Sequence, residues 1–174
     1  MTSNITLVLG GASSGKSLWA ENFVLRQASK AHYVATALAF DSEMKEKITR
    51  HRSRRGAEWT TIEEHLALQS CISSLPQSSP ILVDCATMWL SNLLFEKKDL
   101  IGECNDFCQY LMTYKGQLVI VSNEVGQSVI PETKMGRCFQ IAQGRLNQDL
   151  AAIASTVVFI TAGLPMVLKG SLDR

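Results

Sequence analysis

The sequence predicts an α/β fold: one domain over residues 1–174, of the P-loop nucleotide-binding type, with a mostly parallel sheet and helices on both faces. Short, nearly continuous apolar runs alternate with segments of helical periodicity. A glycine-rich loop joins the first apolar run to the first helical segment. No repeat or linker divides the chain, whose length suits one core. Continuous apolar runs favour parallel strands, because an antiparallel sheet with one wet face would show alternation.

The apolar runs define the expected strands. The run Ile5-Thr6-Leu7-Val8-Leu9 is short, rich in β-branched residues and ended by a glycine pair, which is typical of a buried strand. Similar runs occupy residues 32–36, 80–84, 118–122 and 156–160, and a weaker one lies at 58–61. The tail over residues 163–169 is expected to be an edge strand or an extended arm.

The spacing of apolar residues predicts the helices between these strands. The first follows the glycine-rich loop, with Trp19 and Phe23 on one face at i, i+4. A second begins after Asp41 as its cap and runs through residues 44–48. Further helices are expected at 63–73, 87–95, 101–114 and 134–154. In the last of these the residues at helical spacing are Met135, Cys138, Phe139, Ala142, Leu146, Leu150 and Ile153.

The loop itself carries the strongest functional signal. Residues 10–17 read Gly-Gly-Ala-Ser-Ser-Gly-Lys-Ser and fit the phosphate-binding pattern G-x-x-x-x-G-K-[ST]. Between a strand and a helix, its amides would point at a phosphate, because the first N–H groups of a helix have no internal partner. Lys16 would reach the β and γ phosphates, and the Ser17 hydroxyl would bind a bridging Mg²⁺. The alternative is a strand-to-helix turn without ligand. The predicted contacts are Gly10, Gly11, Ala12, Ser13, Ser14, Gly15, Lys16 and Ser17.

Polar residues at other strand ends extend this site. Asp84 follows an apolar strand, where a metal-facing carboxylate is expected beside a phosphate loop, although it could instead cap the next helix. Residues 123–126 read Asn-Glu-Val-Gly after another strand and could bind substrate or orient the metal. This tetrapeptide differs from the N-K-x-D pattern by which many GTPases recognise guanine, so the sequence motifs do not indicate whether GTP or ATP is bound. The polar stretch 144–148 is equally compatible with an exposed helix face and with a functional role.

Residues 45–55 form a strongly basic segment, with six Lys and Arg side chains against Glu46 alone. Such a segment is usually a solvated helix face. His51, however, shares an i, i+4, i+7 stripe with Met44 and Ile48. Surrounding cations oppose protonation of its imidazole and so favour the neutral, nucleophilic form. From the residues alone, a phosphate or surface contact by this histidine is the commoner alternative.

Bulk properties narrow the function classes. The formal charge is +1, which gives no reason to expect a nucleic acid partner. No apolar run is long enough to span a bilayer and no leader pattern is present, so a cytoplasmic protein is expected. The five cysteines are an odd number without a C-x-x-C pair. Cys104 and Cys108 at i, i+4 are therefore expected to be core residues, with a metal site as the weaker alternative.

Together, these motifs resemble the bifunctional adenosylcobinamide kinase/adenosylcobinamide-phosphate guanylyltransferase family of cobalamin biosynthesis. The resemblance covers nearly the whole chain, and several of its motifs are specific to that family. They lie at residues 10–17, 33–36, 48–52, 59–64, 83–94, 123–126, 131–132, 144–148 and 163–170.

The resemblance implies a two-step transferase. Such an enzyme phosphorylates the aminopropanol hydroxyl of adenosylcobinamide with ATP or GTP, and then transfers GMP from GTP to adenosylcobinamide phosphate. The resemblance implies that His51 attacks the α-phosphorus of GTP and carries GMP, and that the protein forms homotrimers. Ser13 stands where the family often has arginine. The further nucleotide contacts that the resemblance implies are Val34, Ala35, Thr36, Arg52, Ser53, Arg54, Arg55, Glu63 and Asp84.

Two alternatives compete with this interpretation. The first is a plain P-loop small-molecule kinase whose basic segment only covers ATP and which forms no covalent nucleotide. The second is a non-catalytic, nucleotide-gated binding module that uses residues 45–55 to hold an acidic partner or RNA.

Overall fold

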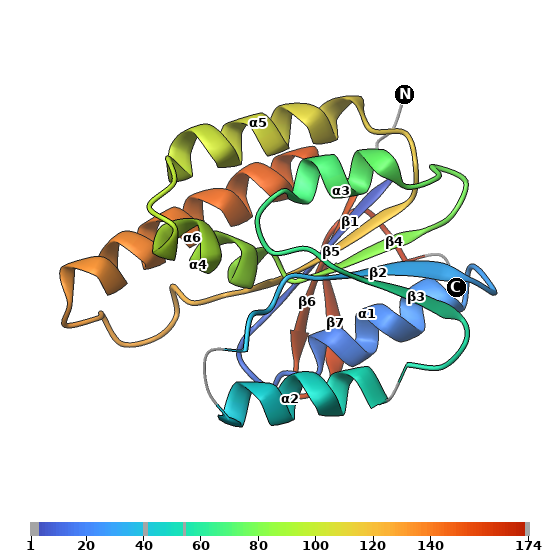
Figure 1. The fold of residues 1–174 in the computed structure, drawn as a ribbon, viewed down its shortest axis with the longest axis horizontal. Helices are drawn as coiled ribbons and strands as arrows, with labels where there is room; N and C mark the ends of the chain where they lie inside the picture. The colour runs from blue at the N-terminus through green and yellow to red at the C-terminus, as the bar shows by residue number, and fades with distance from the viewer. Residues whose placement is uncertain (1–3, 40–41, 54, 173–174) are drawn as a thin grey trace.

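A seven-stranded sheet forms the centre of the protein in a computed structural model, which describes residues 4–39, 42–53 and 55–172 (Figure 1). The strand order is β3-β2-β4-β5-β1-β6-β7. All neighbours pair in parallel except β6 and β7, which are antiparallel. This confirms the predicted, mostly parallel sheet with an edge strand at residues 163–169. The strands are β1 (Ile5–Gly10), β2 (Ala31–Ala35), β3 (Trp59–Glu63), β4 (Ile81–Asp84), β5 (Leu118–Asn123), β6 (Thr156–Thr161) and β7 (Leu164–Lys169).

Helices cover both faces of the sheet, as predicted. In Figure 1, α3, α4, α5 and α6 lie on one face and α1 lies on the other. Successive residues of β1 serve the two layers: Leu7 packs in the core beneath α3 to α6, and Val8 packs in the core beneath α1. Trp19 and Phe23 on α1 stack at 5.1 Å, as their spacing predicts. The helices are α1 (Lys16–Leu25), α2 (Ser42–Ser53), α3 (Leu68–Ser74), α4 (Ala86–Phe95), α5 (Leu100–Thr113) and α6 (Lys134–Ile153).

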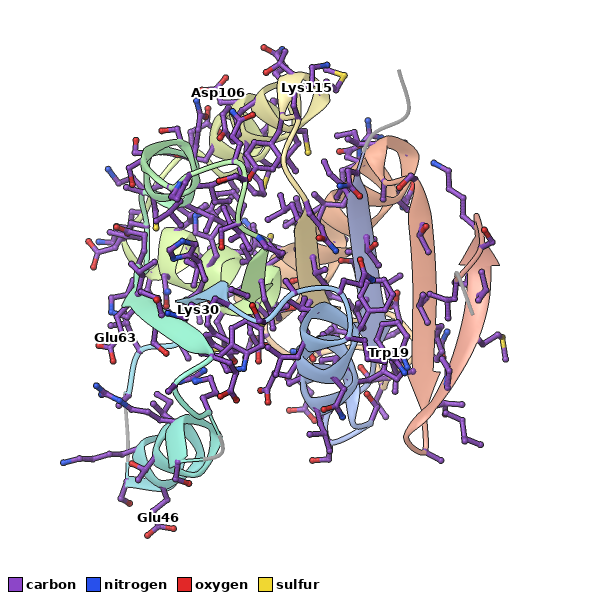
Figure 2. All side chains as sticks on the ribbon, turned by 90° about the vertical axis from the view of Figure 1, so that its right-hand side faces the viewer. Trp19, Lys30, Glu46, Glu63, Asp106 and Lys115 are labelled. Carbon is purple, nitrogen blue, oxygen red and sulfur yellow. The ribbon has the colours of Figure 1, made fainter. Side chains whose placement is uncertain are left out.

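Helix α2 stands apart from these layers. Both figures place it beyond the lower end of the sheet, and in Figure 2 the labelled Glu46 points away from the rest of the molecule. Of its side chains, those of residues 43, 44, 47, 50 and 51 lie outside the described part of the structure, as do Asp41 and the cap predicted there. Ile48 is half-buried, whereas Lys45, Glu46 and Thr49 are exposed.

Two predicted helices need correction. The helix expected from residue 63 begins only at Leu68, because Glu63 ends β3 and the Glu64 carboxylate binds the amides of Leu66 and Ala67 at 2.8 Å each. These bonds make a turn in place of the first helical turn.

Helix α6 has its predicted bounds to within one residue, but its first turns are not a core face. Met135 is 55% exposed and Cys138 is also exposed, because this end of α6 runs past the edge of the sheet (Figure 1). Leu146 and Leu150, further along, are buried as expected. Cys108 is buried and Cys104 packs against the core, which confirms their assignment as core residues. Among the described residues, no helix is both long and apolar enough to cross a membrane.

Candidate active site

The loop after β1 is built around two glycines at which a side chain would meet close contacts or backbone strain. A Cβ on Gly10 would lie 2.6 Å from the Ile160 carbonyl oxygen. Gly15 has φ +91°, and its Cβ would lie 3.2 Å from the Cα of Gly163. The Gly163 amide also donates to the Ser14 carbonyl at 2.9 Å. The loop therefore packs directly against the turn between β6 and β7, and its shape is set by backbone contacts.

The loop delivers Lys16 to the start of α1. Lys16 is only 9% exposed, and its Nζ donates to the Gly11 carbonyl at 3.1 Å, which holds the ammonium over the loop. Gly15 is the N-cap of α1 and provides no side-chain cap, so the first amides of the helix remain available to an anion. Burial raises the pKa of the Cys85 thiol to about 11, and the positive charge of Lys16 acts in the opposite direction.

Asp84 ends β4 and is half-buried. One of its oxygens, Oδ2, accepts a hydrogen bond of 2.6 Å from the Tyr33 hydroxyl. Burial raises the pKa of Tyr33, and the charge of Asp84 and this hydrogen bond raise it further, so Tyr33 is protonated and is the donor. The N-cap of α4 is Cys85, which makes no side-chain cap bond. Asp84 is thus held by a phenol and does not serve as the helix cap that the sequence left open.

Sheet register brings the predicted segments to one edge. Gly10 is opposite Asn123, Asp84 is opposite both Val121 and Ala35, and Ala35 is opposite Glu63. Because these strands are parallel, the segments that follow them leave the sheet on the same side. The amide of the next residue after Asn123 donates to the Gly10 carbonyl at 3.0 Å, which extends the contact past the sheet. The structure therefore brings the predicted strand-end residues to one edge of the sheet.

A buried polar network supports this edge from below. The Ser122 hydroxyl donates to Asn147 Oδ1 at 2.7 Å and accepts from Gln143 Nε2 at 2.9 Å. Asn147 Nδ2 then donates to the Asn123 carbonyl at 3.0 Å, and the Thr87 hydroxyl accepts from the Asn123 amide at 2.7 Å. The polar stretch 144–148 is therefore divided: Asn147 is 5% exposed and internal, whereas Arg145 and Gln148 lie on an exposed face. Two polar residues four apart, Gln143 and Asn147, were the only sequence signal of this network.

Residues 34–36, which the resemblance implies as nucleotide contacts, differ in burial. Val34 and Thr36 are fully buried, and the Thr36 hydroxyl is bound by Cys85, donating to its carbonyl at 2.7 Å and accepting from its amide at 2.8 Å. Asn92 Nδ2 binds the Thr36 carbonyl at 2.8 Å. Ala35 is half-buried at the end of β2. The side chains of Val34 and Thr36 therefore hold the strand end in place, and Asn92, which the sequence did not single out, anchors it.

Arg52 and Arg55 connect the basic segment to strands β3 and β2 of the sheet. Arg52 Nη1 and Glu63 Oε1 form an ion pair at 3.4 Å, and both side chains are more than half exposed. Arg55 places its guanidinium carbon 3.7 Å from the centre of the Tyr33 ring. Ser53 ends α2 and is exposed. Arg54 and the side chain of His51 lie outside the described residues, so the predictions for them remain predictions.

Comparison with known proteins connects this arrangement to one family. The family model described as "Cobinamide kinase / cobinamide phosphate guanyltransferase" matches residues 6–168. The chain is 42% identical over 167 residues to the bifunctional adenosylcobalamin biosynthesis protein CobP of Pseudomonas aeruginosa, covering 94% of this chain and 96% of the relative. It is 35% identical to the bifunctional adenosylcobalamin biosynthesis protein CobU of Salmonella typhimurium, covering 94% and 98%.

One solved structure shares the fold with little sequence similarity. A Pyrococcus horikoshii OT3 protein superposes with a TM-score of 0.55 at 10% identity, covering 99% of this chain and 90% of its own. This likeness concerns the α/β architecture alone.

Proposed function

This chain belongs to the cobinamide kinase/cobinamide phosphate guanyltransferase family, and we propose that it performs both transfers on the adenosyl form of the substrate at the carboxyl edge of its sheet. The enzyme is a bifunctional kinase and guanyltransferase of cobalamin biosynthesis. In the first step the aminopropanol hydroxyl oxygen attacks the γ-phosphorus of ATP or GTP, and the nucleoside diphosphate leaves. The product is adenosylcobinamide phosphate.

In the second step a neutral imidazole of His51 attacks the α-phosphorus of GTP. The bond from that phosphorus to the bridging oxygen breaks and pyrophosphate leaves, so GMP is held on the histidine nitrogen. An oxygen of adenosylcobinamide phosphate then attacks the same phosphorus, the P–N bond breaks, and adenosylcobinamide-GDP forms. Covalent catalysis suits this chemistry because an imidazole both attacks phosphorus and leaves again. The basic residues 45–55 around His51 support this proposal.

The observation that carries the proposal is the phosphate cradle. A nearly buried Lys16, the uncapped first amides of α1 and a loop shaped by Gly10 and Gly15 present positive potential at one point. Such a cradle binds a triphosphate irrespective of which phosphorus is attacked. One loop is therefore suited to serve both steps, with His51 determining that the α-phosphorus is attacked as well.

The residues at the cradle suit Mg²⁺ with a nucleotide. Ser17 in the first turn of α1 and Asp84 at the end of β4 would hold the ion, which when bound neutralises charge on the phosphates. Magnesium commonly takes one or two protein oxygens and completes its shell with phosphates and water. In the described part of the chain, no group of three or more His, Cys, Asp or Glu could form a complete metal cage. This favours an ion that arrives with the nucleotide.

The test uses GTP labelled at the α-phosphate, followed by denaturing electrophoresis and mass spectrometry. The expected result is an acid-labile GMP adduct on His51 that is absent from His51→Asn, while that variant retains kinase activity. His32→Asn is the matched control, because His32 lies within β2, and it should keep the adduct. If the protein transfers only the γ-phosphate, the guanylyl-histidine step is wrong and a plain kinase remains.

We also propose that the enzyme is a homo-oligomer, a trimer by family resemblance. Every residue of the edge strand β7 is exposed, including Leu164 at 69% and Leu168 at 56%. An apolar strand edge of this kind is usually covered. Light scattering at the assay concentration should give three times the chain mass, and Leu168→Glu should reduce it. A monomer for the unmodified chain would contradict this proposal.

A further inference from the structure

Tyr33 holds two parts of the candidate site by different faces. Its hydroxyl donates to Asp84 Oδ2 at 2.6 Å, and the face of its ring lies 3.7 Å from the Arg55 guanidinium carbon. The ring also meets Trp59 edge-on, with centroids 5.6 Å apart at 89°. Tyr33 is only 2% exposed. A phenol enclosed on these sides has little freedom to rotate, so its hydroxyl is fixed in space.

A fixed donor restrains the carboxylate that it binds. Asp84 is half-buried, and a carboxylate in that setting can turn about its terminal bond unless a partner holds one oxygen. The Tyr33 hydrogen bond occupies Oδ2 and therefore decides where the second oxygen is directed. Hydrogen bonds of this type, from a neutral donor to an ionised acceptor, are stronger than neutral ones. Residues that orient a metal ligand in this way commonly change metal affinity by about 10-fold to 100-fold.

The stacked arginine strengthens the same arrangement. Arg55 lies on the connection from α2 to β3, and its charge rests on the ring that binds Asp84. A guanidinium on an aromatic face is attracted to the negative potential of the ring, which resists tilting of the phenol. The edge contact with Trp59 acts from β3, a different strand. Residues from β3, from β4 and from the end of the basic segment thus all contact the Tyr33 side chain, two of them at its ring and Asp84 at its hydroxyl.

We propose that Tyr33 is a positioning residue that sets the orientation of Asp84 for Mg²⁺ in both transfers. The inference rests on the metal role proposed above for Asp84. It predicts that the hydroxyl of Tyr33, more than its ring, controls the affinity for the divalent ion. The catalytic rate at saturating Mg²⁺ should change much less than the Mg²⁺ concentration that gives half of that rate.

The test is Tyr33→Phe, which removes the hydroxyl and keeps the ring for Arg55 and Trp59. Binding of Mn²⁺, as a paramagnetic substitute for Mg²⁺, is titrated by electron paramagnetic resonance with the full chain and a non-hydrolysable GTP analogue. We expect about tenfold weaker Mn²⁺ binding than in the unmodified protein. Tyr110→Phe, on α5, is the matched control and should bind Mn²⁺ as the unmodified protein does. Unfolding midpoints of both variants verify that they are folded.

Asp84→Asn distinguishes the positioning role of Tyr33 from the metal-binding role proposed for Asp84. If Asp84→Asn weakens Mn²⁺ binding and Tyr33→Phe does not, the positioning role is wrong while the metal role of Asp84 stands. If Asp84→Asn leaves Mn²⁺ binding unchanged, both roles are wrong. In the double variant, the effect of Tyr33→Phe should disappear, because the charged acceptor is gone. An undiminished effect there would also overturn the inference, since the hydroxyl would then act by a route other than Asp84.

Discussion

The phosphate loop and helix α2 serve the same nucleotide in the proposed reaction, but the protein holds them in different ways. The loop is enclosed by backbone contacts with the β6–β7 turn and carries a nearly buried Lys16. Helix α2 stands beyond the sheet (Figures 1 and 2). Its Arg52 forms an exposed ion pair with the sheet, and Arg55, just after the helix, stacks on Tyr33. In the proposed reaction, triphosphate binding would therefore rest on the sheet itself, whereas attack on the α-phosphorus would depend on a segment at the periphery of the sheet.

The largest expected effect is at the loop. Lys16→Ala should reduce both the kinase step and formation of the GMP adduct by about 100-fold or more, because a preorganised charge on the phosphates is lost from a single shared cradle. Both rates are measured with saturating Mg²⁺. Lys30→Ala, an exposed lysine beyond the end of α1, should leave both rates unchanged. If the adduct forms normally in Lys16→Ala, the guanylyl donor binds elsewhere and the comparison drawn above is wrong.

The next largest effect is expected in the buried polar network at the end of β5. Asn147→Ala should lower the free energy of unfolding by about 2 kcal/mol, because it leaves the Ser122 hydroxyl and the Asn123 carbonyl without their buried partner. Denaturant titration measures this change. Gln148→Ala removes an exposed amide from the same helix and should change stability little. Equal stability of the two variants would mean that the network does not hold this edge.

A smaller effect is expected at the turn between β3 and α3. Burial acts to raise the pKa of Glu64, but the hydrogen bonds from Leu66 and Ala67 outweigh it, so the pKa lies below its ordinary value. A depressed pKa stabilises the folded state above the ordinary pKa and loses that contribution as pH falls through the folded-state pKa. Glu64→Gln should therefore cost about 1 kcal/mol at neutral pH. That cost should shrink in acid.

Urea titrations at neutral pH and near pH 4 measure this dependence. Glu96→Gln is the control, since Glu96 is exposed and should show little difference at either pH. A cost for Glu64→Gln that stays constant with pH would mean that the charge of Glu64 is not what stabilises the turn.

The smallest effect should come from loss of the ion pair between Arg52 of α2 and Glu63 of β3. The Arg52 side chain is 68% exposed and the Glu63 side chain 55%, so Glu63→Gln should lower the rate of adduct formation by about twofold at most. The kinase step should not change. Glu46→Gln, on the outer side of α2 in Figure 2, is the matched control. A loss comparable to that of Lys16→Ala would show that α2 is held as firmly as the loop.

Much of the fold was predictable because its signals are local. The apolar runs located the strands, including the edge strand, and the glycine pattern located the loop between β1 and α1. The start of α3 was missed because the Glu64 side chain competes with the backbone for two amides, which helical periodicity does not register. Met135 and Cys138 follow the helical pattern but lie on a part of α6 that has no sheet beneath it.

In the candidate site, too, residues at strand ends could be predicted from local sequence, whereas their partners could not. Asp84 was predictable as a strand end, but its partner Tyr33 is separated from it by 51 positions and meets it only because β2 pairs with β4. Asn92 and Asn147 likewise become functional supports through contacts with distant carbonyls. No spacing rule within one segment predicts such pairs.

The glycine-rich loop at residues 10–17 and the alternation of apolar strands with helices could be predicted from the sequence alone, because both depend on the order of neighbouring residues. The close approach of Gly15 to Gly163, the hydrogen bond from Tyr33 to Asp84 and the stack of Arg55 on Tyr33 arise only in the tertiary structure. The physical reason is that strand pairing and packing join residues far apart in the chain, and their directional hydrogen bonds depend on positions that all the other contacts set together.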